Sequence, residues 1–174
     1  MKLYIMRHGP AEDSAATGRD ADRALTPSGR DRVRGVAQAL VEADEAPGHL
    51  VSSPLVRALQ TAEIMAASVF TKPADRDGSV DVRRELAPGG DAVELVRSLH
   101  AAKRKRVMLV GHEPDLTELI TKLVGEPVPV PMDKAMVVGL LVRGPSDVGL
   151  RFVLEPRKLT WPIDARHGDA PPAR

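Results

Sequence analysis

The feature that most constrains the fold is a pattern that recurs three times along the chain: a short apolar run followed by a helix with one apolar face. The apolar runs cover residues 3–6, 49–52 and 106–110. Runs of this length, bounded by polar or glycine-containing segments, are typical of buried strands. Strands that alternate with helices favour a largely parallel sheet with helices on both faces. We therefore predict an α/β fold, a three-layer sandwich with a mostly parallel central sheet.

The helix in each of these units begins near a proline. Thr26 and Ser53 directly precede Pro27 and Pro54, as expected for a capping residue followed by proline at the first helical position, and Pro114 is expected to begin a third helix. The apolar residues of the three helices recur at intervals of three and four: Val33, Val36, Ala37, Leu40 and Val41; Leu55, Ala58, Leu59, Ala62 and Ala66; Leu116, Leu119, Ile120 and Leu123. Each helix therefore has one face that can pack on the sheet.

Two segments are predicted to be connections. Residues 11–25 are polar and are expected to form a surface loop. Residues 71–91 are rich in Gly, Pro and Asp and contain one short strand pattern, at residues 80–82. Asp91 is expected to cap a further helix, which leads to the third apolar run.

The last part of the chain lacks the alternation of strand and helix. Residues 136–142 and 150–154 are predicted to be two strands joined by a turn, as in a hairpin. From residue 162 onward there are three prolines and few apolar side chains, which is typical of a frayed terminus. We predict a single domain over residues 1–161 and a flexible C-terminal tail over residues 162–174.

Charge and composition argue against several kinds of partner. The 174 residues include 25 Lys and Arg against 24 Asp and Glu, so with a net charge of +1 we expect neither nucleic acid nor a membrane as partner. The aromatic residues (one Trp, one Tyr, two Phe) are too few for a base-stacking surface. Cysteine is absent, which excludes disulfides, thiolate metal sites and cysteine nucleophiles. A cytoplasmic location is expected, because the first apolar run is too short for a signal peptide.

The first apolar run ends in Arg7-His8-Gly9-Pro10, and in α/β sheets ligands bind outside the carboxyl ends of strands. Gly9 and Pro10 permit a turn, so that both preceding side chains can reach one ligand. Arginine offers a donor fork for phosphate or carboxylate, and histidine is a nucleophile, an acid or base, or a metal ligand. On these four residues alone, a capping arginine beside a hydrogen-bonded histidine is an equal alternative.

Two further candidates lie near predicted helix starts. Arg57 falls in the first turn of the helix after Pro54, where backbone N–H groups and the helix dipole favour an anion; the alternative is a solvated helix arginine. His112 follows the third apolar run and precedes Pro114. Its ring can donate to an anion, or it can bond a nearby carbonyl as an ordinary loop residue.

These residues lie in three of four segments that resemble, in order, the motifs of the histidine phosphatase superfamily, which has the phosphoglycerate-mutase-like fold. The segments are the Arg-His-Gly signature in residues 3–9, the LTxxG element in residues 25–29, the SSPxxRAxQTA helix in residues 52–62 and the second-histidine motif in residues 110–114. The resemblance extends over residues 1–125. The small size and the segment at residues 86–91 are most similar to the SixA-type phosphohistidine phosphatases.

This resemblance implies a phosphatase that acts through a covalent intermediate. His8 would attack phosphorus and become a transient phosphohistidine, which water then hydrolyses. Arg7, Arg57 and His112 would bind the non-bridging oxygens, so neither a metal nor a cofactor is expected. The attacking imidazole must be neutral, and two neighbouring guanidinium groups would lower its pKa below the usual value of about 6.5.

The general acid of the family pattern has no convincing match in this chain. Many branches place a Glu or Asp after the second helix, where it protonates an alkoxide leaving group. Glu85 is nearest to that place in sequence, with Asp91, Glu12 and Glu113 as rivals, and the alternative for each is a solvated carboxylate. An imidazole leaving group needs less help from an acid than an alkoxide does. This favours a phosphohistidine substrate over a sugar phosphate.

The preferred hypothesis is a SixA-type phosphatase that acts on phosphohistidine in a protein. A broad-specificity small-molecule phosphomonoesterase is the alternative among enzymes, and a catalytically silent phosphate-binding regulatory module is the alternative outside them. The connection after Phe70 is too short to roof the pocket, which favours a protein substrate, and we expect a monomer. The basic run at residues 103–106 is either a docking patch for an acidic partner or charge that complements a helix end.

Overall fold

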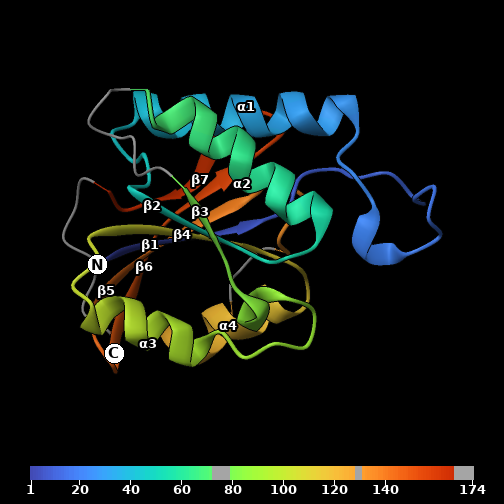
Figure 1. Ribbon diagram of the computed structural model, residues 1–174. Helices are drawn as coiled ribbons and strands as arrows, with labels where there is room; N and C mark the ends of the chain where they lie inside the picture. Colours follow the sequence, from blue (N-terminus) through green and yellow to red (C-terminus); the bar gives the residue numbers. More distant parts are fainter. Residues whose placement is uncertain (72–78, 128–130, 167–174) are drawn as a thin grey trace.

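The computed structural model describes residues 1–71, 79–127 and 131–166 and shows a seven-stranded sheet with helices on both faces (Figure 1). The strands are β1 (Lys2–Arg7), β2 (His49–Ser52), β3 (Val80–Val82), β4 (Arg106–Gly111), β5 (Val137–Gly144), β6 (Asp147–Glu155) and β7 (Thr160–Asp164). The helices are α1 (Pro27–Glu42), α2 (Val56–Val69), α3 (Val93–Ala101) and α4 (Asp115–Val124), with the short 3₁₀ segments η1 (Asp20–Asp22) and η3 (Arg84–Leu86). The predicted three-layer α/β fold is confirmed.

Strand direction divides the sheet into two halves. The strand order is β3-β2-β4-β1-β5-β6-β7; the pairs from β3 to β1 are parallel, and the pairs from β1 to β7 are antiparallel. The sheet is therefore mixed, and the prediction of a mostly parallel sheet holds only for the half that contains β1 to β4. Helices link the strands of the parallel half, whereas tight turns join β5 to β6 and β6 to β7 and so reverse the chain. β5 itself follows α4 but runs antiparallel to β1.

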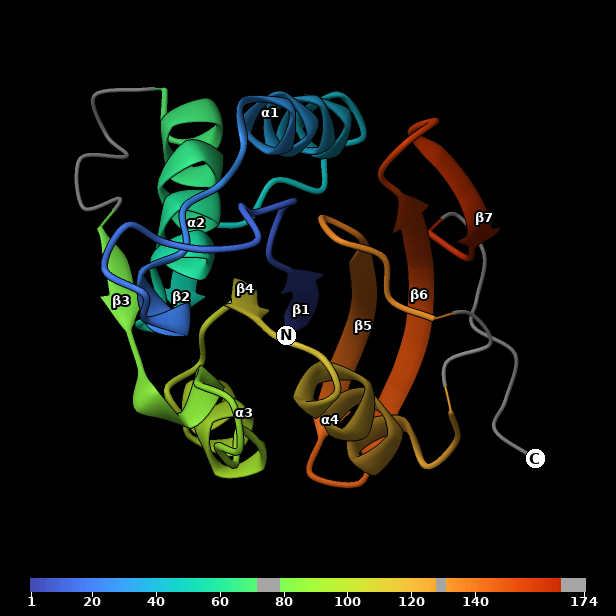
Figure 2. The same cartoon turned by 90° about the vertical axis from the view of Figure 1, so that its right-hand side faces the viewer.

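Each face of the sheet carries its own apolar core. Successive residues of β1 point to opposite faces, so Leu3 and Ile5 pack toward α3 and α4, while Tyr4 and Met6 pack toward α1 and α2. Figure 2 shows the two helix pairs on either side of the sheet. Because β1 is buried on both faces, its polar residues can lie only at its ends.

The helix starts agree with the sequence patterns to within two residues. Thr26 caps α1 by accepting a hydrogen bond from the Gly29 N–H at 3.0 Å, as predicted. The second helix begins at Val56 instead of Pro54, so Ser53 does not cap it. The third begins after Pro114, at Asp115.

The predicted boundary of the C-terminal tail is wrong. Residues 162–164 belong to β7, which pairs with β6, and Trp161 packs edge-on against Phe152 with the ring centres 5.0 Å apart. Proline is tolerated in this strand because β7 lies at the edge of the sheet. The rest of the predicted tail, from residue 167, lies outside the described residues, as do residues 72–78 of the predicted connection. No helix in the described residues has the length and apolar character needed to cross a membrane.

Candidate active site

The carboxyl ends of three neighbouring parallel strands, β2, β4 and β1, lie side by side. The His8 N–H donates to the Gly111 carbonyl at 3.1 Å, and the Ser53 N–H donates to the Val110 carbonyl at 3.0 Å. These bonds continue the strand ladders by one residue beyond β1 and β2. Because His112 directly follows β4, the side chains of His8, Ser53 and His112 gather at the carboxyl ends of the three strands.

His8 is held as a neutral ring with one nitrogen free to react. Its Nδ1 lies 2.7 Å from the Gly9 carbonyl oxygen, which can only accept, so the ring proton is on Nδ1 and Nε2 keeps its lone pair. Burial lowers the pKa of His8 to about 3; the bond to Gly9 opposes this shift, whereas His112, Arg57 and Arg7 add to it. The rings of His8 and His112 have centres 5.1 Å apart.

His112 is oriented by the hydroxyl group of Ser53. The distance between His112 Nε2 and Ser53 Oγ is 2.8 Å, and the same hydroxyl accepts from the Leu55 N–H at 3.3 Å. We assign the hydroxyl as the donor to Nε2. With this assignment the ring proton is on Nδ1, which is buried and has no hydrogen-bond partner. Burial, reinforced by Arg57 and opposed by Asp20, lowers the pKa of His112 to about 4.

In each of the two predicted arginines, one end of the guanidinium group is hydrogen-bonded to another residue. Arg7 Nη1 donates to the Met132 carbonyl at 2.7 Å, and Arg57 donates from Nη1 and Nη2 to Asp20. Within the described residues, the buried side-chain N and O atoms that lack a hydrogen-bond partner are Arg7 Nε, Arg57 Nε and His112 Nδ1. All three can donate, and leaving a donor unpaired in the interior costs about 1–3 kcal/mol. Unpaired donors on three of the four predicted site residues suit the binding of an anion.

Thr61 connects two parts of the site and was not singled out from the sequence. Its hydroxyl accepts from the Gly9 N–H at 3.0 Å and donates to the Arg57 carbonyl at 2.7 Å. A side chain at Gly9 would bring its Cβ within 2.8 Å of Val33, so the backbone after His8 packs tightly against α1 and α2. The available signal was the spacing, since Thr61 lies one helical turn after Arg57.

Asp20 and Arg23 reach the site from the segment predicted to be a surface loop. Asp20 contacts Arg57, and the charge of Arg23 contributes to the lowered pKa of His112. No local pattern pointed to either residue, because the contact between Asp20 and Arg57 joins positions 37 residues apart. Ser53 was interpreted as a helix cap, and its bond to His112 was likewise missed.

The predicted candidates for a general acid have partners close to them in the chain. These partners are Arg83 Nη2 for Glu85 (3.0 Å), the Val93 N–H for Asp91 (3.0 Å) and Thr117 Oγ1 for Glu113 (2.6 Å). The bond from Arg83 lowers the pKa of Glu85, so this carboxyl group is more fully ionised near neutral pH and has no proton to donate in that form. Glu12 is exposed. None of these contacts joins the four carboxylates to His8 or His112.

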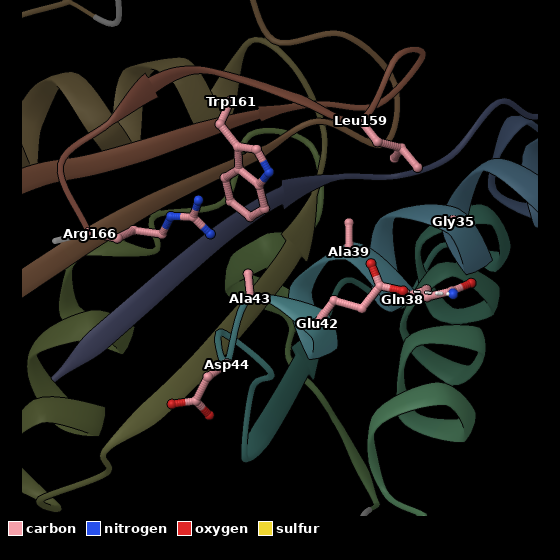
Figure 3. Close-up of a pocket in the computed structure, with 9 residues that line it drawn as sticks. All are labelled: Gly35, Gln38, Ala39, Glu42, Ala43, Asp44, Leu159, Trp161 and Arg166. Carbon is pink, nitrogen blue, oxygen red and sulfur yellow. Dashed lines mark hydrogen bonds between the residues drawn. The ribbon is translucent and has the colours of Figure 1, made fainter.

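A hollow of about 620 Å³ lies away from this cluster, between α1 and β7 (Figure 3). Small residues of α1 face Leu159 and Trp161 across it, and the Arg166 guanidinium lies 3.6 Å from the centre of the Trp161 indole. None of the predicted site residues lines this hollow, so the hollow is not the candidate active site. Among the described residues, no group of three or more His, Cys, Asp or Glu is placed to hold a metal ion.

Comparison with known proteins identifies the family. The family model of the histidine phosphatase superfamily (branch 1) matches residues 3–78. An uncharacterized protein of Picosynechococcus is 40% identical over 121 residues, which are 68% of this chain and 70% of that protein. Phosphohistidine phosphatase SixA of Escherichia coli is 31% identical over 126 residues, which are 71% of this chain and 74% of that protein.

The fold agrees with this relationship. The solved structure of the protein histidine phosphatase SixA complexed with tungstate matches with a TM-score of 0.81 and 26% identity, over 92% of this chain and 100% of that chain. The motif order, the family model, the relative in Escherichia coli and the architecture are therefore consistent. The chain belongs to the histidine phosphatase superfamily, in its SixA-type branch, and is a phosphatase.

Proposed function

We propose that this phosphatase hydrolyses phosphohistidine in a protein, in the cytoplasm, through a covalent phosphohistidine on His8. One observation carries the proposal: His8 Nε2 keeps its lone pair in a neutral ring, while the neighbouring Arg7, Arg57 and His112 each have a buried, unpaired N–H. A neutral nucleophile among cationic and polar donors suits phosphoryl transfer, in which the chief task is to position the group and stabilise its negative oxygens.

The reaction takes place in two displacements. His8 Nε2 attacks phosphorus in line, the P–N bond of the substrate breaks, and the leaving imidazole takes up a proton from solvent water. Arg7, Arg57 and His112 donate to the non-bridging oxygens, whose charge is held most tightly in the transition state. Water then attacks the phosphohistidine, which releases inorganic phosphate and restores neutral His8.

Two observations support phosphohistidine as the substrate class. The relative in Escherichia coli is named a phosphohistidine phosphatase. In addition, Glu85, Asp91 and Glu113 are bound to local partners, so none is poised as an acid for an alkoxide. An imidazole leaving group tolerates such a site better than an alkoxide does.

The covalent route is tested by rapid quenching after mixing with a ³²P-labelled phosphohistidine protein. The wild type should trap label that is stable to base and labile to acid, His8→Ala should trap none, and His100→Ala, on α3, serves as the matched control that traps label normally. Turnover by His8→Ala would remove His8 as the nucleophile. Faster turnover of p-nitrophenyl phosphate or sugar phosphates than of the phosphohistidine protein would refute the substrate assignment and leave the covalent route intact.

A further inference from the structure

Asp20 is the residue whose contacts with the site the proposed reaction does not explain. It lies in η1, within the loop between β1 and α1, and accepts twice from Arg57: its backbone oxygen from Nη1 at 2.8 Å and its carboxylate Oδ2 from Nη2 at 3.0 Å. The Arg57 side chain is only 6% exposed, whereas that of Asp20 is 64% exposed. A surface loop thus binds a buried arginine of the site through two separate hydrogen bonds.

Asp20 is itself held from the other side by Arg23. Arg23 Nε donates to Asp20 Oδ1 at 2.8 Å, and Arg23 Nη1 donates to the Glu12 carbonyl at 2.9 Å, which ties the two ends of the loop together. Slight burial acts to raise the pKa of Asp20, but the hydrogen bonds from Arg23 and Arg57 outweigh it, so the pKa is lowered. The carboxylate is therefore ionised at neutral pH, with one oxygen bound to each arginine.

The geometry of the guanidinium shows what this arrangement leaves free. The group has five N–H bonds in one plane. Asp20 engages one on Nη1 and one on Nη2 of Arg57, whereas Nε is buried without a partner. The Nη edge is thus fixed to the loop, and the Nε edge is left for another acceptor. A contact that only kept Arg57 from binding a ligand would not be expected to leave the Nε edge unpaired.

We propose that Asp20 is a positioning residue that clamps the Nη edge of Arg57 and so aims its Nε edge at the transferring phosphoryl group. The inference rests on the proposed function, in which Arg57 binds that group. A planar fork that is held in advance loses less entropy when it binds, and small misplacements of such a group are costly.

The contact between Asp20 and Arg57 also has an electrostatic cost, and this cost can be measured as an effect on the affinity for an anion. The negative charge of Asp20 lies beside a site for an anion, so it weakens binding of the ground state even as it improves alignment. Removing Asp20 should therefore lower kcat without weakening the affinity for inorganic phosphate. General damage to the site would instead lower both.

The test compares Asp20→Ala, Asp20→Asn and the matched control Asp22→Ala by kcat, by the inhibition constant of inorganic phosphate and by thermal melting. Asp22 lies in the same η1 but hydrogen-bonds to Thr17 instead of Arg57, so its variant should behave as wild type. Asp20→Ala should lower kcat by about 10- to 100-fold with phosphate affinity unchanged or tighter. Asp20→Asn keeps a side-chain acceptor and should retain most of kcat, while phosphate binds more tightly.

A double-mutant comparison separates this inference from the proposed function. In Arg57→Ala, adding Asp20→Ala should cause no further loss, because Asp20 acts through Arg57. If Arg57→Ala alone is fully active, the proposed role of Arg57 fails. If Arg57→Ala is impaired but Asp20→Ala has wild-type or higher kcat, or if Asp20→Ala adds its full loss to Arg57→Ala, the clamp is refuted and the proposed function stands.

Discussion

Two clusters of buried polar groups lie at opposite ends of β1, and they are built in opposite ways. At the start of the strand, Glu45 accepts from Lys2 at 3.0 Å, from Tyr4 at 2.8 Å and from both Nη atoms of Arg151 at 3.0 and 2.9 Å. At the other end of β1, the cluster around His8 leaves three donors unpaired.

The pKa values separate the clusters in the same way. Partial burial acts to raise the pKa of Glu45, but the hydrogen bonds from Arg151, Lys2 and Tyr4 outweigh it and lower that pKa to about 2. The charged form of the carboxylate is therefore stabilised. At the other end, burial lowers the pKa of His8 to about 3 and that of His112 to about 4, so these rings are kept uncharged. In the Glu45 cluster the polar groups are hydrogen-bonded to one another, whereas the His8 cluster has unpaired donors and a free lone pair. We therefore expect a division of roles: the first cluster stabilises the fold, and the second binds a ligand.

Breaking the Glu45 cluster should have the largest effect, and it should be on stability. Glu45→Ala leaves Arg151, only 9% exposed, without its carboxylate, and losing one partner of a buried ion pair costs about 3–5 kcal/mol. Urea unfolding measures the loss. Glu42→Ala, an exposed change on α1, is the control and should have little effect. A Glu45→Ala protein as stable as wild type would show that this cluster is not structural.

The matching change at the other end should affect catalysis instead. In the proposed mechanism, Arg57→Ala removes a donor to the transition state, worth about 2–4 kcal/mol in kcat/KM, or roughly 30- to 1,000-fold. Steady-state kinetics on a phosphohistidine protein measure the loss. The free energy of unfolding should fall much less than in Glu45→Ala, and an equal fall would contradict the division between the clusters.

The two clusters should also respond to acid in different pH ranges. The folded state lowers the pKa of His8 from 6.5 to about 3, so the unfolded chain binds more protons and stability falls as the pH drops below 6.5. The contribution of Glu45, whose pKa is lowered from 4.5 to about 2, is lost only below pH 4.5.

Urea unfolding between pH 5 and pH 6.5 therefore isolates the histidines. His8→Gln should reduce the dependence of unfolding free energy on pH by up to about 1.4 kcal/mol per pH unit, which corresponds to one proton. His100→Gln, outside the site, is the control. An unchanged dependence in His8→Gln would mean that His8 titrates alike in both states.

Loss of the Ser53 hydroxyl should have a small effect on catalysis. Ser53→Ala removes the hydroxyl that selects the His112 tautomer, and a neutral hydrogen bond contributes about 0.5–1.5 kcal/mol, so kcat/KM should fall by about 2- to 12-fold. Nitrogen-15 NMR of the imidazole should show the Nδ1–H form of His112 in the wild type and a mixture in the variant. A wild type already in the Nε2–H form would contradict the proposed orientation.

The sequence alone was informative wherever a periodic pattern coincided with burial. The buried strands β1, β2 and β4 and the apolar faces of α1 and α2 were predictable because their hydrophobic spacing is local. β7 was missed because Pro162 interrupts a short, half-exposed strand at the sheet edge, where packing against Phe152 outweighs propensity. The antiparallel half was underestimated because strand direction follows from turns more than from the strands themselves.

For the site, the sequence predicted four residues, Arg7, His8, Arg57 and His112, because their residue types and flanking turns are local features that match a family pattern. Tertiary contacts are needed for two other features: Ser53 hydrogen-bonds to His112, and Asp20 binds Arg57. These contacts join segments far apart in the chain. They exist only because parallel strands bring distant loops to one edge of the sheet, which no local spacing encodes.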